Sequence, residues 1–554
     1  MSQTYRLLSE GIPGRRGVGS STFPPDARKT RAWVAALPRA NGLATQQSLD
    51  QALDSLAGQR LEGSQRLSVL EELRPAIGES VGLLKREYAG SALPLAATKA
   101  AAAQQVEGFH LALAHGYRLA AVELCSPSGN IPMLRSGTVA TALARSAWHY
   151  VQALAVAWRV YRAPAPGAWQ GLYRLRHFAA QHRLDTRAVE DVLAGSPVEI
   201  RGVYVQSLLM AITHPLAFSQ VEQDVLWQCT REFSARCHVT RSIPRENAPV
   251  VPDDADRGPG PAAIGEKPGQ WLDMDAFCSE VDAALARQVD GHADIVPTRG
   301  NAIRISVEML ERLRRSFGLA AARSHKRLPA SHGLRTVFGL SSLHFYLAGQ
   351  RDFDSFMRQA SQQIVHIIDR ASWAGAATDV SRVPVHEATV LDQSLGGYRM
   401  AWSHASQIRA RVGELVGLTL ADADEYPEWM LGVIRWLRYE ADGGLSAGIE
   451  LISRRTAAVG LRVHGNDGFA QEPIRALEMR SLADEEINFL APNTLDCGAT
   501  RIEVVRDLVA GSDVLPSVEE ILAGVDVLLN AGDYALLRPL RRDLVTDAGV
   551  EAGQ

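Results

Sequence analysis

Two groups of polar residues in the second half of the chain have types and spacing that suit ligand binding. Asp392 and Ser394 stand beside a Leu-Gly-Gly sequence, where a carboxylate acceptor and a hydroxyl can receive the edge of a ligand. Arg323 and Arg327 occur upstream in the run Arg-Ser-His-Lys-Arg. Guanidinium groups are planar donors that match phosphate or carbonyl oxygens. A small anionic ligand held by local arginines is therefore compatible with this part of the chain.

The stretch 388–402, which holds the two acceptors, is predicted to form a β-hairpin. β-Branched and apolar residues lie on both sides of the turn, and Gly396 and Gly397 can supply the positive φ angles that tight hairpins need. Hairpins are common in proteins. The rest of the sequence must therefore show whether this one belongs to a binding site.

The size and composition of the chain indicate a multidomain globular protein. For 554 residues, at roughly 150 residues per domain, three or four units are expected. Hydrophobic residues make up 46% and charged residues 22%, which is typical of folded chains. The formal net charge of -4 gives no reason to expect a nucleic-acid polymer or an anionic membrane surface as a partner.

Cysteine usage and hydropathy predict a cytoplasmic location. The five cysteines show no CxxC spacing, and their odd number in a long chain favours reduced thiols. No uninterrupted apolar run reaches the ~20 residues that a membrane-spanning helix needs, so no membrane span is expected. Cys229 and Cys237-His238 lack a further ligand at regular spacing, so no metal site is expected either.

The first half of the chain is predicted to be helical. Residues 1–30 mix Gly, Ser, Pro and Arg and are expected to be a flexible tail. Apolar residues then recur at three- and four-residue steps, so 31–243 is predicted to be a domain of stacked helical hairpins. A stack of degenerate helical repeats is one form that this domain can take. The Pro-, Gly- and charge-rich stretch 244–270 is predicted to be a linker, and 271–318 a helical segment.

From residue 319 the pattern changes to short strands. The range 319–465 is predicted to be a small antiparallel β-barrel with a helical insertion at 351–378, and 334–347 is assigned to its first strand. The range 466–545 is predicted to be a second small β domain. A degenerate barrel is one fold that this domain can have. The predicted fold class is therefore α+β and multidomain: an all-helical N-terminal region, a small antiparallel β-barrel and a second small β unit.

No set of residues has the spacing of a catalytic site. Gly444-Leu-Ser446-Ala-Gly448 matches the GxSxG pattern of serine hydrolases, but the residues after Ser446 read as a strand where that pattern needs a helix. His386-Glu387 lacks the second histidine of a zinc-binding HExxH motif. The chain is therefore expected to be non-enzymatic, with no catalytic residues and no cofactor.

The arginine pair and the turn together resemble the two motifs of the PilZ domain. Arg323-Ser-His-Lys-Arg327 matches RxxxR, which stands ahead of the barrel in that family. Asp392-Gln-Ser394-Leu-Gly-Gly397 matches (D/N)xSxxG on the barrel surface. Three later sequences are similar to the family's later strands: 412–418, 432–436 and 447–451. The resemblance covers about a quarter of the chain.

PilZ domains bind the bacterial messenger cyclic di-GMP, and the resemblance implies that this chain does so. Arg323 and Arg327 would contact phosphate or a guanine edge from a loop that closes over the ligand. Asp392 would accept from guanine N–H groups, and Ser394 would orient Asp392 or reach phosphate. Gly397 would allow a backbone conformation, or a close approach to the backbone, that a side chain would block. The resemblance thus implies a cytoplasmic second-messenger receptor that passes a signal to a protein partner through its helical region.

The spacing of the two motifs departs from the family's usual pattern. A single strand usually separates them, whereas here the predicted insertion 351–378 also intervenes. If this insertion covered the site, the barrel would be a degenerate one that binds protein in place of nucleotide. A scaffold or interaction protein without nucleotide binding is therefore the second hypothesis. Whether the insertion blocks the site decides between the two.

Overall fold

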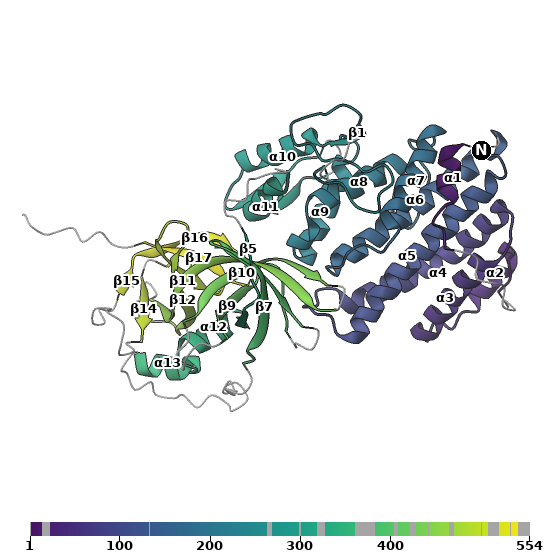
Figure 1. The fold of residues 1–554 in the computed structure, drawn as a ribbon. Coiled ribbons are helices and arrows are strands. Elements are labelled where there is room, and N and C mark those ends of the chain that lie inside the picture. Colours follow the sequence, from purple (N-terminus) through teal and green to yellow (C-terminus); the bar gives the residue numbers. More distant parts are fainter. Residues whose placement is uncertain are drawn as a thin grey trace, which may run out of the picture. The chain divides into compact units, whose positions relative to one another are not determined.

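The structure is a computed structural model, and it divides the chain into two compact units. These are Met1–Ser324 and His325–Gln554, and each is taken by itself. Helices dominate the first unit, in purple to teal, and strands dominate the second, in green to yellow (Figure 1). The described residues are 2–13, 23–131, 133–262, 269–297, 301–317, 327–360, 383–403, 408–421, 428–440, 443–464, 470–499, 501–507, 520–531 and 533–540.

The first unit is built mainly from packed helices. Its longest helix, α5 (Ala97–Leu124), is rich in alanine and leucine, which are the strongest helix formers. It packs against both α4 (Gly63–Tyr88) and α6 (Ser136–Arg159), and its Phe109 and Leu113 are buried. The other helices up to residue 233 are α1 (Gln3–Ser9), α2 (Ala27–Ala35), α3 (Gly42–Gly58), α7 (Ala168–Gln181), α8 (Ile200–Ile212) and α9 (Gln220–Phe233). The predicted helical N-terminal region is confirmed.

The first unit ends in a smaller part that mixes helices and strands. Its elements are β1 (His238–Thr240), β2 (Trp271–Asp273), α10 (Asp275–Ala286), β3 (His292–Ile295), β4 (Ile303–Ser306) and α11 (Val307–Phe317). The paired strands β3 and β4 lie within the range 271–318, which the sequence predicts to be a helical segment, and they fall between its two helices. Along β3 the burial alternates, with Ala293 and Ile295 buried, which is the two-residue period of a strand. A four-residue strand is too short for that period to stand out from its helical neighbours.

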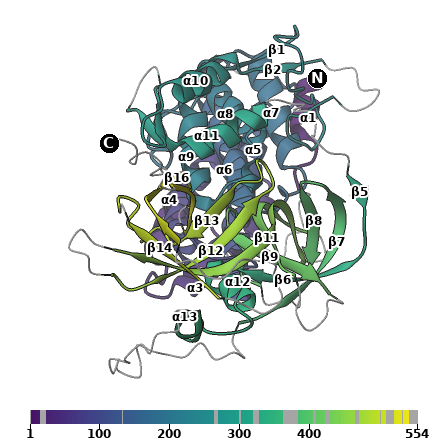
Figure 2. The same ribbon diagram turned by 90° about the vertical axis from the view of Figure 1, so that its left-hand side faces the viewer.

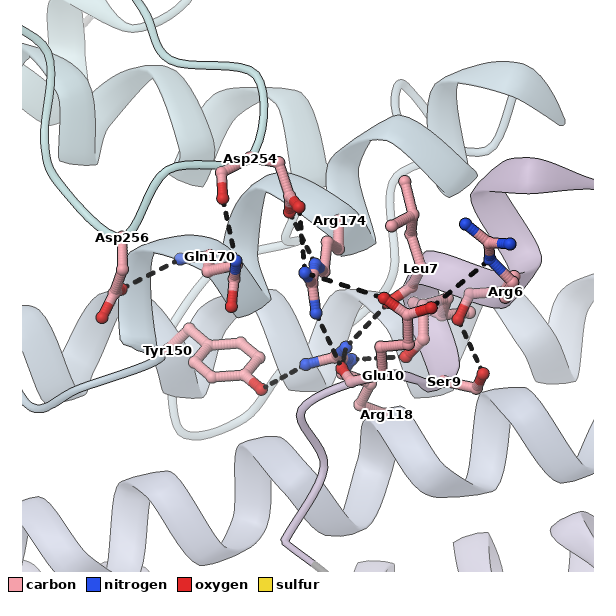
Figure 3. Close-up of polar contacts among 11 residues, drawn as sticks. Arg6, Leu7, Ser9, Glu10, Arg118, Tyr150, Gln170, Arg174, Asp254 and Asp256 are labelled. Atoms are coloured by element: carbon pink, nitrogen blue, oxygen red, sulfur yellow. Dashed lines mark hydrogen bonds and ion pairs between the residues drawn. The ribbon is translucent and has the colours of Figure 1, made fainter.

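The N-terminal residues are held against the helices of the first unit (Figure 3). Leu8 of α1 is fully buried, although the sequence predicts a flexible tail over 1–30. Arg118 of α5 donates from Nε to the Leu8 carbonyl at 2.7 Å and from Nη2 to the Glu10 carbonyl. The last carbonyl groups of a helix have no partner within the helix, so this guanidinium caps α1. Residues 14–22 of the predicted tail lie outside the described residues.

Part of the predicted linker 244–270 also packs on this unit. Val251 is buried. Arg174 of α7 donates from Nε and Nη2 to the two carboxylate oxygens of Asp254, at 2.5 and 2.9 Å (Figure 3). A bidentate pair of this kind fixes both position and orientation. The described part of the stretch is therefore attached to α7, and residues 263–268 lie outside the described residues.

The second unit begins with a closed antiparallel barrel (Figure 2). Its strands are β6 (Gly333–Phe338), β7 (His386–Ser394), β8 (Gly397–Trp402), β9 (Leu415–Leu420), β10 (Met430–Tyr439) and the first half of β11 (Leu445–Val463), with the short β5 (Leu328–Pro329) beside β7. Pairing runs β6–β7–β8–β11–β10–β9 and returns from β9 to β6. Such closure leaves no free sheet edge in the ring. The predicted small antiparallel barrel is confirmed.

The segment after β6 is a helix, so the predicted strand over 334–347 is wrong in its second half. Gly339 has a φ of 80°, a conformation that favours glycine, and it ends β6. The helix α12 (Leu340–Leu347) follows (Figure 2). Its Leu343 is buried against barrel residues. Short apolar runs are ambiguous between strand and helix. Here the leucines recur at i, i+3 and i+7, which is the spacing of a helical face.

The strands after β11 form a second ring. They are β12 (Ile474–Ser481), β13 (Ile487–Ala491), β14 (Ile502–Arg506), β15 (Glu520–Leu522), β16 (Gly524–Asn530) and β17 (Ala535–Leu540). The second half of β11 pairs with β12 and β14, β12 with β13, β13 with β17, and β17 with β16. β15 pairs with β14 and continues into β16 through Ala523, whose N–H donates to the Leu540 carbonyl at 2.7 Å. With β15 and β16 taken as one bent strand, the ring closes around buried Val459, Phe489 and Leu537.

Both rings have the same strand order. β11 is the last strand of the first ring and the first strand of the second. Numbered along the chain, the strands of each ring then run 1-2-3-6-5-4. The second β unit therefore repeats the topology of the first barrel.

The predicted helical insertion 351–378 is described in part. Its helix α13 (Phe353–Ala360) buries Phe356 and Met357. These side chains cluster with Val505 of β14 and with a buried alanine of β11. The described part of the insertion is therefore packed on strands of the second ring. Residues 361–378 lie outside the described residues.

A carboxyl group lies where the two rings meet. Glu414, just before β9, accepts a hydrogen bond from the Arg411 N–H at 2.9 Å. The Tyr534 hydroxyl, from the residue before β17, donates to the neighbouring Gly413 carbonyl at 3.3 Å. Burial raises the pKa of Glu414 to about 7, and the negative charge of Asp533 adds to the shift, while the Arg411 N–H and guanidinium oppose it.

We predict that Glu414→Gln removes a pH-dependent loss of stability. The pKa of the folded state lies above the ordinary value of 4.5, so the folded chain binds more protons, and the free energy of unfolding falls between about pH 4.5 and 7. The fall is up to about 3 kcal/mol, since one pKa unit corresponds to about 1.4 kcal/mol. Denaturant unfolding at pH 4.5 and 8 measures it. The exposed control Glu428→Gln should keep the fall, and an equal fall in both variants would contradict the prediction.

Candidate functional site

The hairpin predicted over 388–402 is present as β7 and β8. Ser394 and Gly397 form its last pair, so that Leu395 and Gly396 make a two-residue loop. Leu395 points outward and is 72% exposed. The Ser394 hydroxyl donates to the Gly397 carbonyl at 3.3 Å, which links the ends of the two strands at the turn. The two polar acceptors of the motif therefore stand at the end of β7, next to an exposed loop.

Gly397 is required because the turn lies directly against β11. Its φ is 154°, and a Cβ built on it would lie 2.0 Å from the Ile449 carbonyl oxygen. The neighbouring Gly396 carbonyl accepts from the Leu451 N–H at 2.9 Å. A side chain at 397 would therefore push the hairpin away from β11. The glycine of the motif therefore has a structural task at this turn.

Arg327 reaches Asp392 through the short strand β5. Leu328 pairs with Gln393 and Pro329 with Asp392, which places the arginine just before β5 beside the end of β7. The Arg327 Nη1 donates to Asp392 Oδ1 at 3.0 Å, and both side chains are partly exposed. The structure thus brings together two predicted site residues in spite of the long segment between their motifs. Arg323 lies outside the described residues.

Three further charged residues form a series of ion pairs that begins at Asp392, and the motifs gave no sign of them. Arg399 is directly opposite Asp392 in the β7–β8 ladder, with its Nη1 4.0 Å from Asp392 Oδ2. Its Nη2 lies 3.6 Å from Glu440 Oε1 at the end of β10. Arg438 donates to both carboxylate oxygens of Glu440, at 2.8 and 2.9 Å. Strand alternation could have placed Arg399 on the face of Asp392 once the register was known.

Glu440 is held as a carboxylate by its neighbours. Burial favours its neutral form, but hydrogen bonds from Ser446 and Arg438 and the charges of Arg438 and Arg399 outweigh it and lower the pKa of Glu440. Ser446 is fully buried and donates to Glu440 Oε1 at 2.6 Å. It lies on β11, which continues as a strand to Val463, so the GxSxG match is not a nucleophile elbow.

The arrangement is suited to binding a ligand. Arg327, Arg399 and Arg438 are each about one third to two fifths exposed, so their donors can reach a ligand at the barrel surface. Asp392 and Glu440 lie between them as acceptors. Arginine matches phosphate oxygens or the O6/N7 edge of guanine, and a carboxylate matches N–H groups. Among the described residues, no three His, Cys, Asp or Glu side chains come together as a metal site.

Two family models match the chain. One is described as the N-terminal domain of the cyclic-di-GMP receptor FimW and matches residues 28–245. The other is described as the middle PilZ domain of that receptor and matches residues 270–379 and 365–457. The chain belongs to the PilZ family. Its first ring, which holds the Asp392 hairpin, is the PilZ barrel, and a helical region precedes it.

The similarity extends well beyond the PilZ barrel. The cyclic-di-GMP receptor FimW of Pseudomonas aeruginosa is 23% identical to this chain over 526 residues. The similar part covers 86% of this chain and 85% of FimW.

In the described part of this PilZ-family chain, none of the helices has the length and hydrophobicity for crossing a lipid bilayer.

We predict that Gly397→Ala destabilises the PilZ barrel by about 2 kcal/mol or more, because the new methyl group meets the β11 backbone. The matched control is Gly413→Ala. Gly413 also has a positive φ, of 88°, but no atom lies within 4 Å of a Cβ built on it, so the control should lose only about 1 kcal/mol. Denaturant unfolding of the three chains measures the difference. Equal losses would show that the contact with β11 is not what requires the glycine.

Proposed function

We propose that this PilZ-family chain is a non-enzymatic receptor for cyclic di-GMP. The observation that supports this most is the meeting of the two motifs on the PilZ barrel: Arg327 from the first lies 3.0 Å from Asp392 of the second. Such a contact is what a shared ligand site requires. A protein similar to 86% of the chain is described as a cyclic-di-GMP receptor, which supports the same ligand.

Each motif residue has a role that fits the chemistry of the ligand. Cyclic di-GMP offers two phosphates and two guanines. Arg327 would donate to phosphate or to a guanine O6/N7 edge, and Arg323 would do the same from the segment ahead of it. Asp392 would accept from guanine N–H groups, and Ser394 would reach phosphate or orient Asp392. Gly397 would act indirectly, because it lets the hairpin approach β11.

Binding would exchange one ion pair for contacts with the ligand. The guanidinium of Arg327 and the carboxylate of Asp392 both have matching groups on cyclic di-GMP. Arg399, with its Nη1 4.0 Å from the other oxygen of Asp392, would hold that carboxylate in place during the exchange. We therefore add Arg399 to the proposed site as a positioning residue, with Glu440 holding Arg399 in turn.

The proposed receptor passes its signal to a protein partner in the bacterial cytoplasm. Ligand contacts from Arg323 and Arg327 would fix the segment ahead of β5 against the barrel. The chain boundary between the two compact units falls in this same segment, after Ser324. A ligand that fixes it would change the connection between the barrel and the helical unit, and we propose that the helical unit binds the partner.

We predict that titration calorimetry detects cyclic di-GMP binding to the full chain. Arg323→Ala/Arg327→Ala and, separately, Asp392→Ala should weaken binding about 30-fold or more, because each leaves a charged partner without its contact. The control is Arg538→Ala. This arginine forms a surface ion pair with Glu486 on the second ring and should leave the affinity unchanged.

Two results would count against the receptor. If the wild type released no heat and showed no binding in an independent assay such as equilibrium dialysis, the scaffold hypothesis would replace it. If the wild type bound but neither motif variant lost affinity, the nucleotide site would lie elsewhere on the chain. Thermal unfolding of each variant checks that a loss of affinity is not a loss of folding.

A further inference from the structure

A groove in the helical unit has no part in the nucleotide site. Its floor is α8, which packs against both α6 and α9. A cavity of about 410 Å³ lies there, with Trp148 of α6 and Trp227 of α9 in its walls. A second cavity of about 230 Å³ adjoins it, and both are lined by Gln152 and Trp227. Together the two cavities form one groove that follows α6 and α9.

The length of the groove fits an extended peptide. Its wall on α6 runs from Trp148 to Arg159, which is about 16 Å at 1.5 Å per residue of helix. An extended chain advances about 3.3 Å per residue, so about five residues fill it. Gln152 lies at the centre, where its amide can donate to and accept from a peptide backbone. The two tryptophans offer apolar surface for a side chain of the same peptide.

Lys85 supplies a positive charge in this groove. It lines the second cavity from α4, and within the described residues its ammonium group makes no hydrogen bond or ion pair. Burial lowers the pKa of Lys85, the charge of Arg159 adds to the shift, and Asp224 opposes it. Asp224 is itself held by Arg159, with Nη2 to Oδ2 at 2.6 Å. A sheltered ammonium without a close partner is unfavourable, and a carboxylate from a ligand would relieve it.

The rest of the lining carries more basic than acidic side chains. Arg201 and Arg231 line the first cavity from exposed positions on α8 and α9, where Glu199 is the acidic residue of the wall. Arg231 also forms an ion pair with its neighbour Glu232, with Nη2 3.4 Å from Oε1. In the second cavity, Asp224 is neutralised by its pair with Arg159. Basic groups therefore outnumber acidic ones along the groove. Complementary charge in the ligand would speed its association and exclude basic competitors.

We propose that this groove binds an extended acidic segment of a partner protein, about five residues long, with a carboxylate at Lys85 and an apolar side chain between Trp148 and Trp227. This proposal rests on the proposed function in one point only, namely that the ligand of the groove is a segment of a partner protein. None of the groove residues belongs to the nucleotide site. The groove can therefore be tested without cyclic di-GMP.

The test uses a phage-displayed library of random heptapeptides, selected on the full chain. We expect the recovered peptides to be enriched in Asp and Glu around an apolar residue. The most enriched peptide, labelled with fluorescein, is then titrated with the wild type and with Lys85→Met in fluorescence polarisation. Methionine keeps much of the length of the lysine stem and leaves no charge to shelter, so the variant should fold and should bind at least 10-fold more weakly.

Two further variants complete the test. Arg231→Ser removes an exposed charge at the groove and should also weaken binding, whereas Lys29→Met, at an exposed position of α2, should not. The proposal is overturned if no peptide is recovered, if the recovered peptides show no excess of Asp and Glu, or if Lys85→Met and Arg231→Ser bind as tightly as the wild type. Calorimetry of the Lys85→Met chain with cyclic di-GMP distinguishes failure of the groove proposal from failure of the receptor proposal. The affinity of this variant for cyclic di-GMP should equal that of the wild type.

Discussion

The second unit depends on one long strand, β11, which belongs to both rings. Its first half pairs with β8 and β10, and its second half with β12 and β14. The register of the β11–β12 ladder shifts between Ser453 and Arg455, where the strand passes from one ring to the other. A β-bulge bends a strand and increases its twist, which allows one strand to turn from one barrel into the next. Neither ring closes without it.

The same strand sets the geometry of the candidate site. The turn at Gly397 lies against the backbone of β11, and Ser446 of β11 donates to Glu440 at the end of β10. Glu440 faces Arg399, and Arg399 faces Asp392, so the charged groups form a row across neighbouring strands. A one-residue slip in any of these ladders would turn one member of the row to the other face. The order of the charges is therefore a consequence of register as much as of residue type.

Local patterns predicted the hairpin and its motif residues, because a two-glycine turn between apolar strands is specified within about fifteen residues. What depended on long-range contacts was missed. Arg399 and Glu440 join the site only through the registers of the β7–β8, β8–β11 and β10–β11 ladders. The strand predicted at 334–347 failed because Gly339 ends it, and the following leucines satisfy a helix as well. The second ring closes through a bent strand whose two halves have different partners.

The contrast between β5 and β11 indicates where a ligand could act on this chain. β11 is paired on both sides towards each of its ends, so moving it would break both rings. β5 has two residues and pairs with β7 only at Gln393 and Asp392. A ligand shifts an equilibrium only by its difference in affinity for two states. Such a difference changes most easily the conformation of a segment with few pairing contacts, and β5 is one. In the proposed receptor, the effect of a ligand on the barrel would therefore begin at β5 rather than in the shared strand.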